Sequence, residues 1–588
     1  MLRSFLALAA LAGITAGLAH ADYIIIKVNM GVAPPAAIAI GQPIPPGGVM
    51  PQPMPPVIRP GGPNDKPVDP KAKPDESLTV VVFFEYTKPE PIRGVQLPPG
   101  MGMVRVAHKW GHSYILNDNK FIQLIPDPAK EKPIIRPTVL QAYENKKKDI
   151  VFGKDKSASK HLDLAEFALQ HGLLKQCAEI MEDTAKIETK DPDVIAAVKA
   201  FEKVNADLAK PASRDDAAIA WKDEFRSKVD RSEHYCLLSD TIGPAEVKGR
   251  LARLENNMKA FYYWFALRGK ALPVPDRRMV ALVLEKPIEF TQTHKACGSP
   301  PLVADGFFSR RDNLLVFSAN RLDSVVEPLN RHFTELIQAG WDLKGSVNLK
   351  TWAPPKGKVW QPQETAHANM MGLIKRALEE ESEIATTSHQ GSRQLLAAIG
   401  MLPRGVEIPE WVQFGWPAFF ETPKFDPITH TGAFWAGTGA PSWVYMVHWK
   451  LAESEKRLDE PMDALLGVLT DSYFREANQS KKPEQLLKAR AYAWAFAYYL
   501  SKRQLDGLIR YGQELNQLPR DLEFDGNVHL GAFARSFGLV DANGKITEEK
   551  LDALARDWFK FMSIEPLQMP ELFQEAQRVM KERKAAKQ

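Results

Sequence analysis

The sequence predicts an α+β protein that is predominantly helical, with a small antiparallel β unit near the start of the chain. Short β-branched and aromatic runs such as LTVVVFFEY and MVRVAHKW, separated by Gly, Pro and Asn-Asp-Asn, fill residues 77–127. Such runs are typical of antiparallel strands. From residue 159 onward, apolar residues recur at steps of three and four over long segments, which is typical of helices that bury one face.

Length and charge limit the class of protein. A chain of 588 residues is too long for one hydrophobic core, so we expect three or four structural units. The 76 basic and 72 acidic residues give a net charge of only +4, which offers no argument for a nucleic-acid partner. Cys177, Cys236 and Cys297 are too few and too far apart for a disulfide framework or a Cys-type zinc site. One disulfide is possible, but free thiols are favoured.

The first 21 residues have the pattern of a secretory signal peptide. Arg3 is followed by the apolar run FLALAALAGITAGLA, and Ala19-His20-Ala21 offers small residues at a cleavage site. No later segment holds 18 uninterrupted apolar residues, so we expect no stable membrane span after cleavage. A retained N-terminal anchor has a similar pattern and is the alternative. We therefore expect an exported protein that is periplasmic or extracellular.

Residues 22–76 are predicted to be a disordered linker. From Ala33 onward proline and glycine dominate, and such a segment cannot bury enough apolar surface to offset its ordering entropy. The β unit follows as a small domain, residues 77–140. Residues 141–210 then hold a helical hairpin, because the spacing in LAEFALQHGLLKQCAEIM resembles one tetratricopeptide-like pair of helices. One pair cannot form a solenoid, so a packed adaptor is favoured.

A long domain follows at residues 230–510, and residues 511–588 close the chain as a helical subdomain. The expected order in the long domain is helix, strand, hairpin and helix. These elements are a helix after Pro244, a strand in MVALVL (279–284), a hairpin in GFFSRRDNLLVFSA (306–319) and an amphipathic helix that starts in ATTSHQGSRQLLAAIG (385–400). A strongly apolar helix, PEQLLKARAYAWAFAYYL (483–500), comes later.

Tryptophans are concentrated in one part of this domain. Five of the thirteen fall in residues 411–449. An aromatic platform for a sugar or a peptide is one interpretation, but packing in the core is favoured because large aromatic side chains dominate ordinary cores. The five are Trp411, Trp416, Trp435, Trp443 and Trp449.

The element order, together with the segments TTSHQGSRQLL and PEWVQFGWPAFFE, resembles the gluzincin metallopeptidase fold. The chain is more closely similar to a family of secreted bacterial proteins of unknown function with a peptidase-like domain, over about residues 230–565. The resemblance implies a zincin-like core. In that family, His-Glu-x-x-His on one helix supplies two zinc ligands and a general base. Trp-x-x-Glu-Gly-x-Ala supplies the third ligand about 20–30 residues later.

Compared position by position, this chain keeps only one zinc ligand of the family pattern, His389. The general base falls on Gln390, whose amide cannot accept a proton, and the second ligand falls on Arg393, a cation without a lone pair for a metal. The third ligand falls on Phe414, an apolar ring. The resemblance therefore implies no catalytic residue, no metal and no other cofactor. It places Arg393 where the metal would be, bonded to a nearby carbonyl or carboxylate.

Two carboxylates are candidates to replace the lost ligands, but neither has the expected position. Glu410 lies four residues before Phe414, and Glu421 lies seven residues after it, beyond Pro417. Pro417 stands where the family has a small residue, so the helix there is expected to be broken or to begin late. A rebuilt zinc site is not favoured, because all of its ligands must be placed together.

The sequence thus predicts an exported pseudopeptidase of gluzincin-like fold that binds or scaffolds an unknown protein or an extended peptide in the cell envelope. The absence of His-Glu-x-x-His and of the third-ligand glutamate argues against an enzyme. The alternative is an active metallopeptidase, or another hydrolase, with a relocated site in the same cleft. A third interpretation makes the β unit and the helical hairpin the working surface.

Overall fold

The structure is a computed structural model, and the chain divides into two compact units. The first unit comprises Met1–Arg136 with Ser324–Ala377, and the second comprises Pro137–Asp323 with Leu378–Gln588. The segments predicted to be a signal peptide and a disordered linker, apart from residues 22–29, lie outside the described residues, as do Trp435 and the basic C-terminal tail. The structure describes residues 22–29, 79–87, 102–108, 111–117, 122–124, 126–127, 132–133, 135–136, 139–153, 157–239, 242–297, 305–319, 383–421, 438–480, 483–567, 574 and 577.

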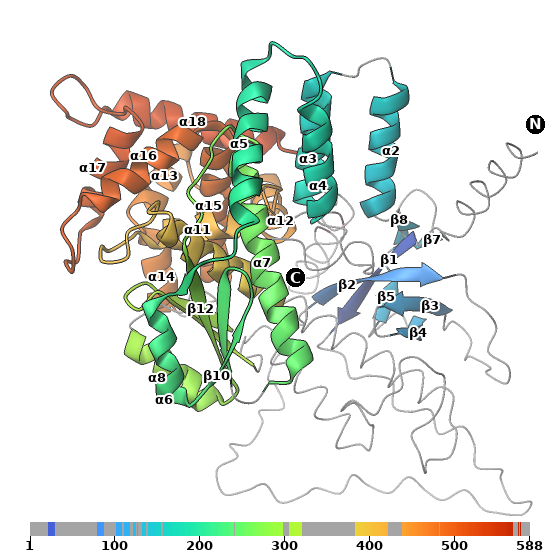
Figure 1. Cartoon of the computed structure of the whole chain (residues 1–588). Coiled ribbons are helices and arrows are strands. Elements are labelled where there is room, and N and C mark those ends of the chain that lie inside the picture. The colour runs from blue at the N-terminus through green and yellow to red at the C-terminus, as the bar shows by residue number, and fades with distance from the viewer. Residues whose placement is uncertain are drawn as a thin grey trace, which may run out of the picture. The chain divides into compact units, whose positions relative to one another are not determined.

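The first unit contains an antiparallel sheet with strand order β4-β3-β2-β1-β5, and β8 also pairs with β1 (Figure 1). This sheet confirms the strands predicted for residues 77–127. One strand was missed, because β1 falls within the residues assigned to the linker. Its sequence DYIIIKVN is rich in β-branched residues, and the proline-rich segment begins only after it. The strands are β1 (Asp22–Asn29), β2 (Thr79–Thr87), β3 (Gly102–His108), β4 (Gly111–Asn117), β5 (Ile122–Leu124), β6 (Pro126–Asp127), β7 (Lys132–Pro133) and β8 (Ile135–Arg136).

The second unit begins with helices. The apolar stripes predicted for residues 159–186 form two packed helices, α3 and α4, joined at Gly172, whose φ of 74° lies in the left-handed region that glycine tolerates. The helices confirm the pattern, while their likeness to a tetratricopeptide pair stays a prediction. The elements are α2 (Val139–Phe152), α3 (Ala158–Gln170), α4 (Leu174–Thr184), α5 (Pro192–Leu208), β9 (Arg214–Asp215), η1 (Ala217–Ala220) and α6 (Trp221–Phe225).

A mixed sheet forms the centre of the second unit, with strand order β10-β11-β12-β14-β13 and β9 paired to β12. Strands β11, β12 and β14 are parallel, and the two outer pairs are antiparallel. The predicted helix after Pro244, the strand in 279–284 and the hairpin in 306–319 are confirmed. The elements are β10 (Lys228–Arg231), β11 (Tyr235–Ser239), α7 (Pro244–Ala266), β12 (Arg277–Leu284), α8 (Pro287–Cys297), β13 (Gly306–Ser309) and β14 (Leu314–Ser318).

Both faces of this sheet are covered, because alternate residues of a strand point to opposite sides. Leu237 and Ala281 belong to a large core cluster that includes α7, whereas Leu238 and Leu282 belong to a smaller cluster that includes Phe290 of α8. Burial on both faces explains why MVALVL is a continuous apolar run instead of an alternating one.

Helices make up the rest of the second unit. The apolar helix predicted at 483–500 is α15, which is buried almost continuously from Ala489 to Leu500. Trp411, Trp416 and Trp449 are fully buried, which confirms core packing for these tryptophans. Residues 383–398 are helical. The labelled helices are α11 (Glu410–Phe419), α12 (Trp443–Ser454), α13 (Pro461–Leu469), α14 (Ser472–Ser480), α15 (Pro483–Arg503), α16 (Leu505–Asn516), α17 (Gly526–Ser536) and α18 (Glu548–Ile564).

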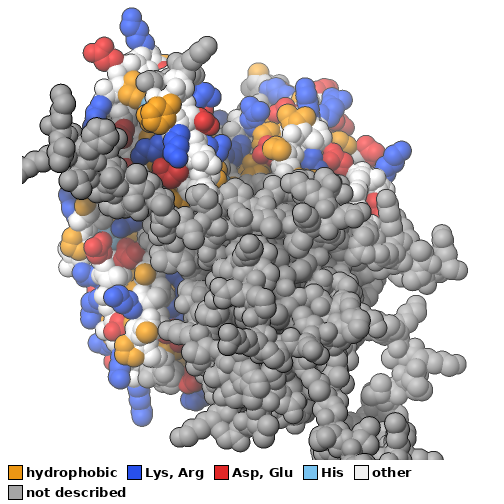
Figure 2. Space-filling model, turned by 90° about the vertical axis from the view of Figure 1, so that its right-hand side faces the viewer, with side chains coloured by type: hydrophobic (Ala, Val, Ile, Leu, Met, Phe, Trp, Pro, Cys, Tyr) orange, Lys and Arg blue, Asp and Glu red, His pale blue; other side chains and the backbone are white. Residues whose placement is uncertain are grey.

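The described residues thus form a predominantly helical protein with small sheets, as the sequence predicted. None of the helices in the described ranges is long and apolar enough to cross a membrane. On the face seen in Figure 2, the described surface carries interspersed basic and acidic side chains. This mixture agrees with the small net charge of the chain.

Candidate functional site

The helix of residues 383–398 is polar and yet completely buried over most of its length. Every residue from Thr386 to Leu396 is buried, including His389, Gln390 and Arg393. The prediction of an amphipathic helix is therefore wrong, because no face of this segment is exposed. Buried polar groups require partners inside the protein, so this helix must be surrounded by a matching set of polar groups.

Two glycines allow close packing around this helix. A Cβ atom on Gly391 would lie 2.8 Å from Asn257 Nδ2 of α7, and one on Gly306 of β13 would lie 2.8 Å from Thr386 Cγ2. Neither distance is compatible with a larger residue unless a neighbour moves. The helix is thus held between α7 and the end strand of the sheet.

Arg393 is the centre of a cluster that we call the Arg393 cluster. Its guanidinium donates from Nη1 to Gln390 Oε1 at 3.0 Å and from Nη2 to Gln413 Oε1 at 2.8 Å. Both amides are oriented by backbone carbonyls, since Gln390 Nε2 donates to Gly306 O and Gln413 Nε2 donates to Ile408 O. Arg393 was predicted to bond a nearby carbonyl or carboxylate, and it bonds the carbonyl oxygens of two side-chain amides. The cluster consists of His389, Gln390, Arg393, Gln413, Phe414 and Glu421.

The charge of Arg393 is not neutralised by a carboxylate. Only 3% of the residue is exposed, and the described residues place no carboxylate within ion-pair distance of it. Burial, together with the nearby Arg310 guanidinium, lowers the pKa of Arg393 to about 9. Arg310 is itself half-buried and donates to the backbone carbonyl of Val406, and the Glu407 carboxylate lies close enough to act on its charge. Arg393 therefore lies near a second cation and donates only to neutral acceptors among the described residues, an arrangement that costs stability.

His389 lies beside this guanidinium and is held by Glu421. Its Nδ1 is 3.1 Å from Glu421 Oε1, and its ring centroid is 5.2 Å from that of Phe414. Because a carboxylate accepts, Nδ1 carries the proton in the neutral ring and Nε2 presents a lone pair. Nε2 is buried and has no hydrogen-bond partner among the described residues. Burial lowers the pKa of His389, and the Glu421 carboxylate opposes this shift.

Helix α11 brings Gln413 and Phe414 to this cluster. Its first two backbone N–H groups donate to Asp471, from Glu410 at 2.7 Å and from Trp411 at 3.0 Å. The helix runs through Pro417 to Phe419, so the expectation of a broken or late helix is wrong. Only the last turn follows the proline, and the loss of one hydrogen bond there is tolerated.

The comparisons with known proteins add one family. Residues 383–520 match a family described as "Protein of unknown function (DUF1570)". No curated protein and no solved structure matches the chain. The DUF1570 match contains every member of the Arg393 cluster and helices α11 to α16, whereas the central sheet and the N-terminal helices lie outside it.

The structure brings together all four positions that the sequence analysis selected within the DUF1570 match. His389 contacts Phe414, and Arg393 contacts Gln390. These residues do not fit a zinc ion, because His389 is the only one of the four with an ordinary zinc-binding side chain, and the others are an amide, a guanidinium and an apolar ring.

Other members of the site were missed or set aside by the sequence analysis. Glu421 was judged too far along the chain, yet it reaches His389 from just beyond α11. No motif or spacing in the sequence pointed to Gln413 or Arg310. Gln394 was also missed, although its Nε2 donates to the backbone carbonyls of Val280 and Asn313 and so joins the helix to the sheet.

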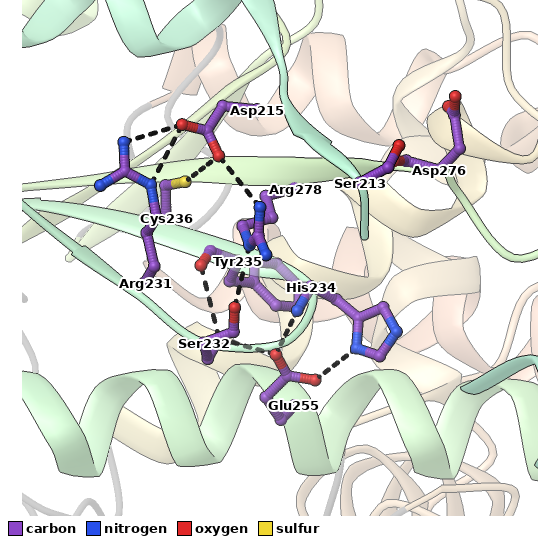
Figure 3. A network of polar contacts seen from close by, with 10 residues as sticks. All are labelled: Ser213, Asp215, Arg231, Ser232, His234, Tyr235, Cys236, Glu255, Asp276 and Arg278. Atoms are coloured by element: carbon purple, nitrogen blue, oxygen red, sulfur yellow. Dashed lines mark hydrogen bonds and ion pairs between the residues drawn. The ribbon is translucent and has the colours of Figure 1, made fainter. Parts of the chain in front are cut away.

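A second polar network lies around β10 and β11, on the opposite side of the mixed sheet from β13 (Figure 3). Asp215 accepts from Arg231 Nη2 at 2.8 Å and from Cys236 Sγ at 3.3 Å. Arg278 Nε donates to the backbone carbonyl of Ser232, whose hydroxyl donates to Glu255 Oε1 at 2.6 Å. Burial raises the pKa of the Cys236 thiol to about 12, so this thiol is not a nucleophile near neutral pH.

Proposed function

We propose that this chain is an exported, zinc-free and catalytically inactive relative of the gluzincin peptidases that binds or scaffolds a protein or extended peptide in the cell envelope. One observation carries the proposal. Arg393, which the resemblance aligns with the second zinc ligand, is buried and bonds Gln390, which the resemblance aligns with the general base. Its other bond goes to Gln413, the residue before Phe414.

The chemistry of these residues supports a loss of peptidase activity. A buried guanidinium repels a metal cation at close range. The amide of Gln390 donates to a backbone carbonyl and accepts from Arg393, so it cannot take a proton from a water molecule. Phe414 has no lone pair to offer a metal.

Binding of an extended chain is supported by the order of the strands. Among the described residues, strand β13 is the last strand on its side of the sheet, after β14, and its four residues are buried. A terminal strand can accept an added strand through its main chain once its edge is uncovered. The carbonyl of Gly306 on this strand is already bonded by Gln390, which connects the Arg393 cluster to the edge where we place the bound chain.

The alternative, a hydrolase with a relocated site, is favoured by the His389–Glu421 pair. A carboxylate at Nδ1 and a free lone pair at Nε2 are the arrangement of a general base. A nucleophile is not evident, since the hydroxyl of Ser392 bonds Asn257 at 3.4 Å.

Activity and metal content of the purified full-length chain test the proposal. Casein and cell-wall fragments should remain intact with and without a chelator, and the wild-type protein and the His389→Ala variant should hold the same amount of zinc. Chelator-sensitive cleavage, or one zinc per chain that is lost in His389→Ala, would overturn the proposal. Chelator-insensitive cleavage that His389→Ala abolishes would instead establish the relocated hydrolase.

A further inference from the structure

The turn between β10 and β11 is fixed from three sides. It consists of Ser232, Glu233 and His234. The backbone N–H of His234 donates to Glu255 Oε1 of α7 at 2.7 Å. The carbonyl of His234 accepts from Met279 N of β12 at 2.8 Å, and that of Glu233 accepts from Ala212 N at 2.9 Å. The positions of these side chains are therefore set by the rest of the second unit.

The imidazole of His234 is held in one orientation. Its side chain is 2% exposed. Nε2 lies 3.2 Å from the backbone carbonyl of Lys210, which can only accept, so Nε2 carries a proton. Nδ1 points at Glu255 Oε2 at 2.9 Å (Figure 3). A histidine that binds a metal through one nitrogen commonly donates from the other to a backbone carbonyl, and His234 has this arrangement.

The two carboxylates near Nδ1 have no lysine or arginine partner in the described residues. Glu255 Oε1 accepts from Ser232 Oγ and His234 N, so Oε2 has only His234 Nδ1. Glu233 is exposed and has no ion pair in the described part of the chain. The nearby Lys210 ammonium is bonded to Asp207.

We propose that Glu233, His234 and Glu255 bind a divalent transition-metal ion such as zinc. One ligand atom from each residue lies within 4.8 Å of the others, and the ion would take the place of the proton between Nδ1 and Oε2. A mixed set of one imidazole and two carboxylates suits zinc or cobalt better than magnesium or calcium, which prefer oxygen ligands. Three protein ligands with exposed Glu233 leave a fourth position for water or for a group of a bound partner.

No sequence pattern predicted this site, because Glu255 is 21 residues from His234 and lies on another element. The site is separate from the Arg393 cluster, with which it shares no residue. An ion here would link the β10–β11 turn to α7, so the inference goes beyond the proposed function of the Arg393 cluster.

Zinc titration of the metal-stripped full-length protein tests the inference. Calorimetry with zinc chloride should show one ion per chain, and the thermal midpoint should rise with zinc but not with the same concentration of magnesium or calcium. Glu233→Gln should weaken zinc binding by more than about tenfold, and folding should be preserved because Glu233 is exposed. Asp230→Asn is the matched control, because Asp230 is an exposed carboxylate three residues away, and it should bind zinc as the wild type does.

Three results would overturn the inference. The first is no zinc binding, and the second is equal binding by the wild type and Glu233→Gln. The third is binding that His389→Ala abolishes while Glu233→Gln leaves it unchanged, which would place the ion in the Arg393 cluster and contradict the proposed function as well.

Discussion

Two arginines of the second unit, Arg268 and Arg393, have opposite electrostatic surroundings. Arg268 Nη2 donates to Glu166 Oε1 at 2.8 Å, and Lys502 Nζ donates to the same oxygen at 2.9 Å. The Arg268 guanidinium also lies 4.0 Å from the centroid of the Trp264 ring, which adds a cation–π contact. Arg393, by contrast, donates to two neutral amides and lies near a second cation, Arg310.

The two arginines differ in role. Arg268 forms, with Glu166 and Lys502, a set of ion pairs that we call the clamp, whereas Arg393 belongs to the candidate site. Glu166 belongs to α3, Lys502 to α15, and Arg268 follows α7, so their ion pairs fix the helical hairpin to the core. The Arg393 cluster makes no such ion pair among its described members, and its charge reduces stability. Proteins break the ordinary rules of polar burial mainly at functional sites, and this difference is why we assign the function to Arg393 instead of Arg268.

The largest loss of stability is expected from displacing α11, the helix that carries Gln413. In Gly415→Ala, the new Cβ would lie 2.3 Å from Ala493 O of α15, so α11 must move and destabilise the protein by about 3 kcal/mol. Gly249→Ala in α7 is the matched control, since no atom lies within 4 Å of its Cβ position. It should stabilise the helix by up to about 1 kcal/mol. Urea unfolding measures both, and equal effects would contradict the close packing of α11 on α15.

A smaller effect is expected from breaking the clamp. Glu166→Gln leaves Arg268 and Lys502 without their shared carboxylate and should cost about 2 kcal/mol, less than a fully buried pair because the Glu166 side chain is 33% exposed. Chemical denaturation at neutral pH measures this loss. A cost near zero would show that the hairpin is held without the clamp.

The same clamp predicts a pH dependence. Burial raises the pKa of Glu166, but Arg268 and Lys502 outweigh it and lower the pKa from 4.5 to about 2. A carboxyl group whose pKa is lower in the folded than in the unfolded protein stabilises the fold at pH values above its unfolded pKa. This stabilisation is lost as the pH falls from 4.5 to about 2. The difference in unfolding free energy between the wild type and Glu166→Gln should therefore shrink over this range. A constant difference would contradict the ion pairs.

The smallest effect is expected at Arg393. Arg393→Met removes two hydrogen bonds and also a buried charge that no carboxylate of the described residues neutralises. The two changes oppose each other, so the free energy of unfolding should change by less than about 1 kcal/mol. Denaturant unfolding of Arg393→Met beside Glu166→Gln gives the comparison directly. If Arg393→Met costs more than Glu166→Gln, the Arg393 cluster is a structural element and the contrast between the two regions fails.

Periodicity in the sequence predicted the elements well, because apolar spacing depends on local geometry. Helices α7 and α15, strand β12 and the β13–β14 hairpin all occur where apolar runs predicted them. Strand β1 was missed because the proline-rich segment after it determined the interpretation of the whole stretch, although Ile24 to Ile26 favour a strand.

The surroundings of the site could be predicted only in part. His389 and Phe414 are 25 residues apart in the sequence, and their rings are in contact. The complete burial of residues 386–396 could not be foreseen, because polar residues on a helix ordinarily indicate an exposed face. Glu421 and Arg310 belong to other elements, and their approach to His389 and Arg393 depends on tertiary packing.

Anomalous scattering at the zinc edge, from crystals of the full-length protein soaked in zinc chloride, tests the central claim most directly. The account predicts no peak at His389 Nε2, which belongs to the same cluster as the buried Arg393 guanidinium, and a peak between Glu233, His234 and Glu255. A peak on His389 would contradict the account, because it would show that the Arg393 cluster still holds a metal.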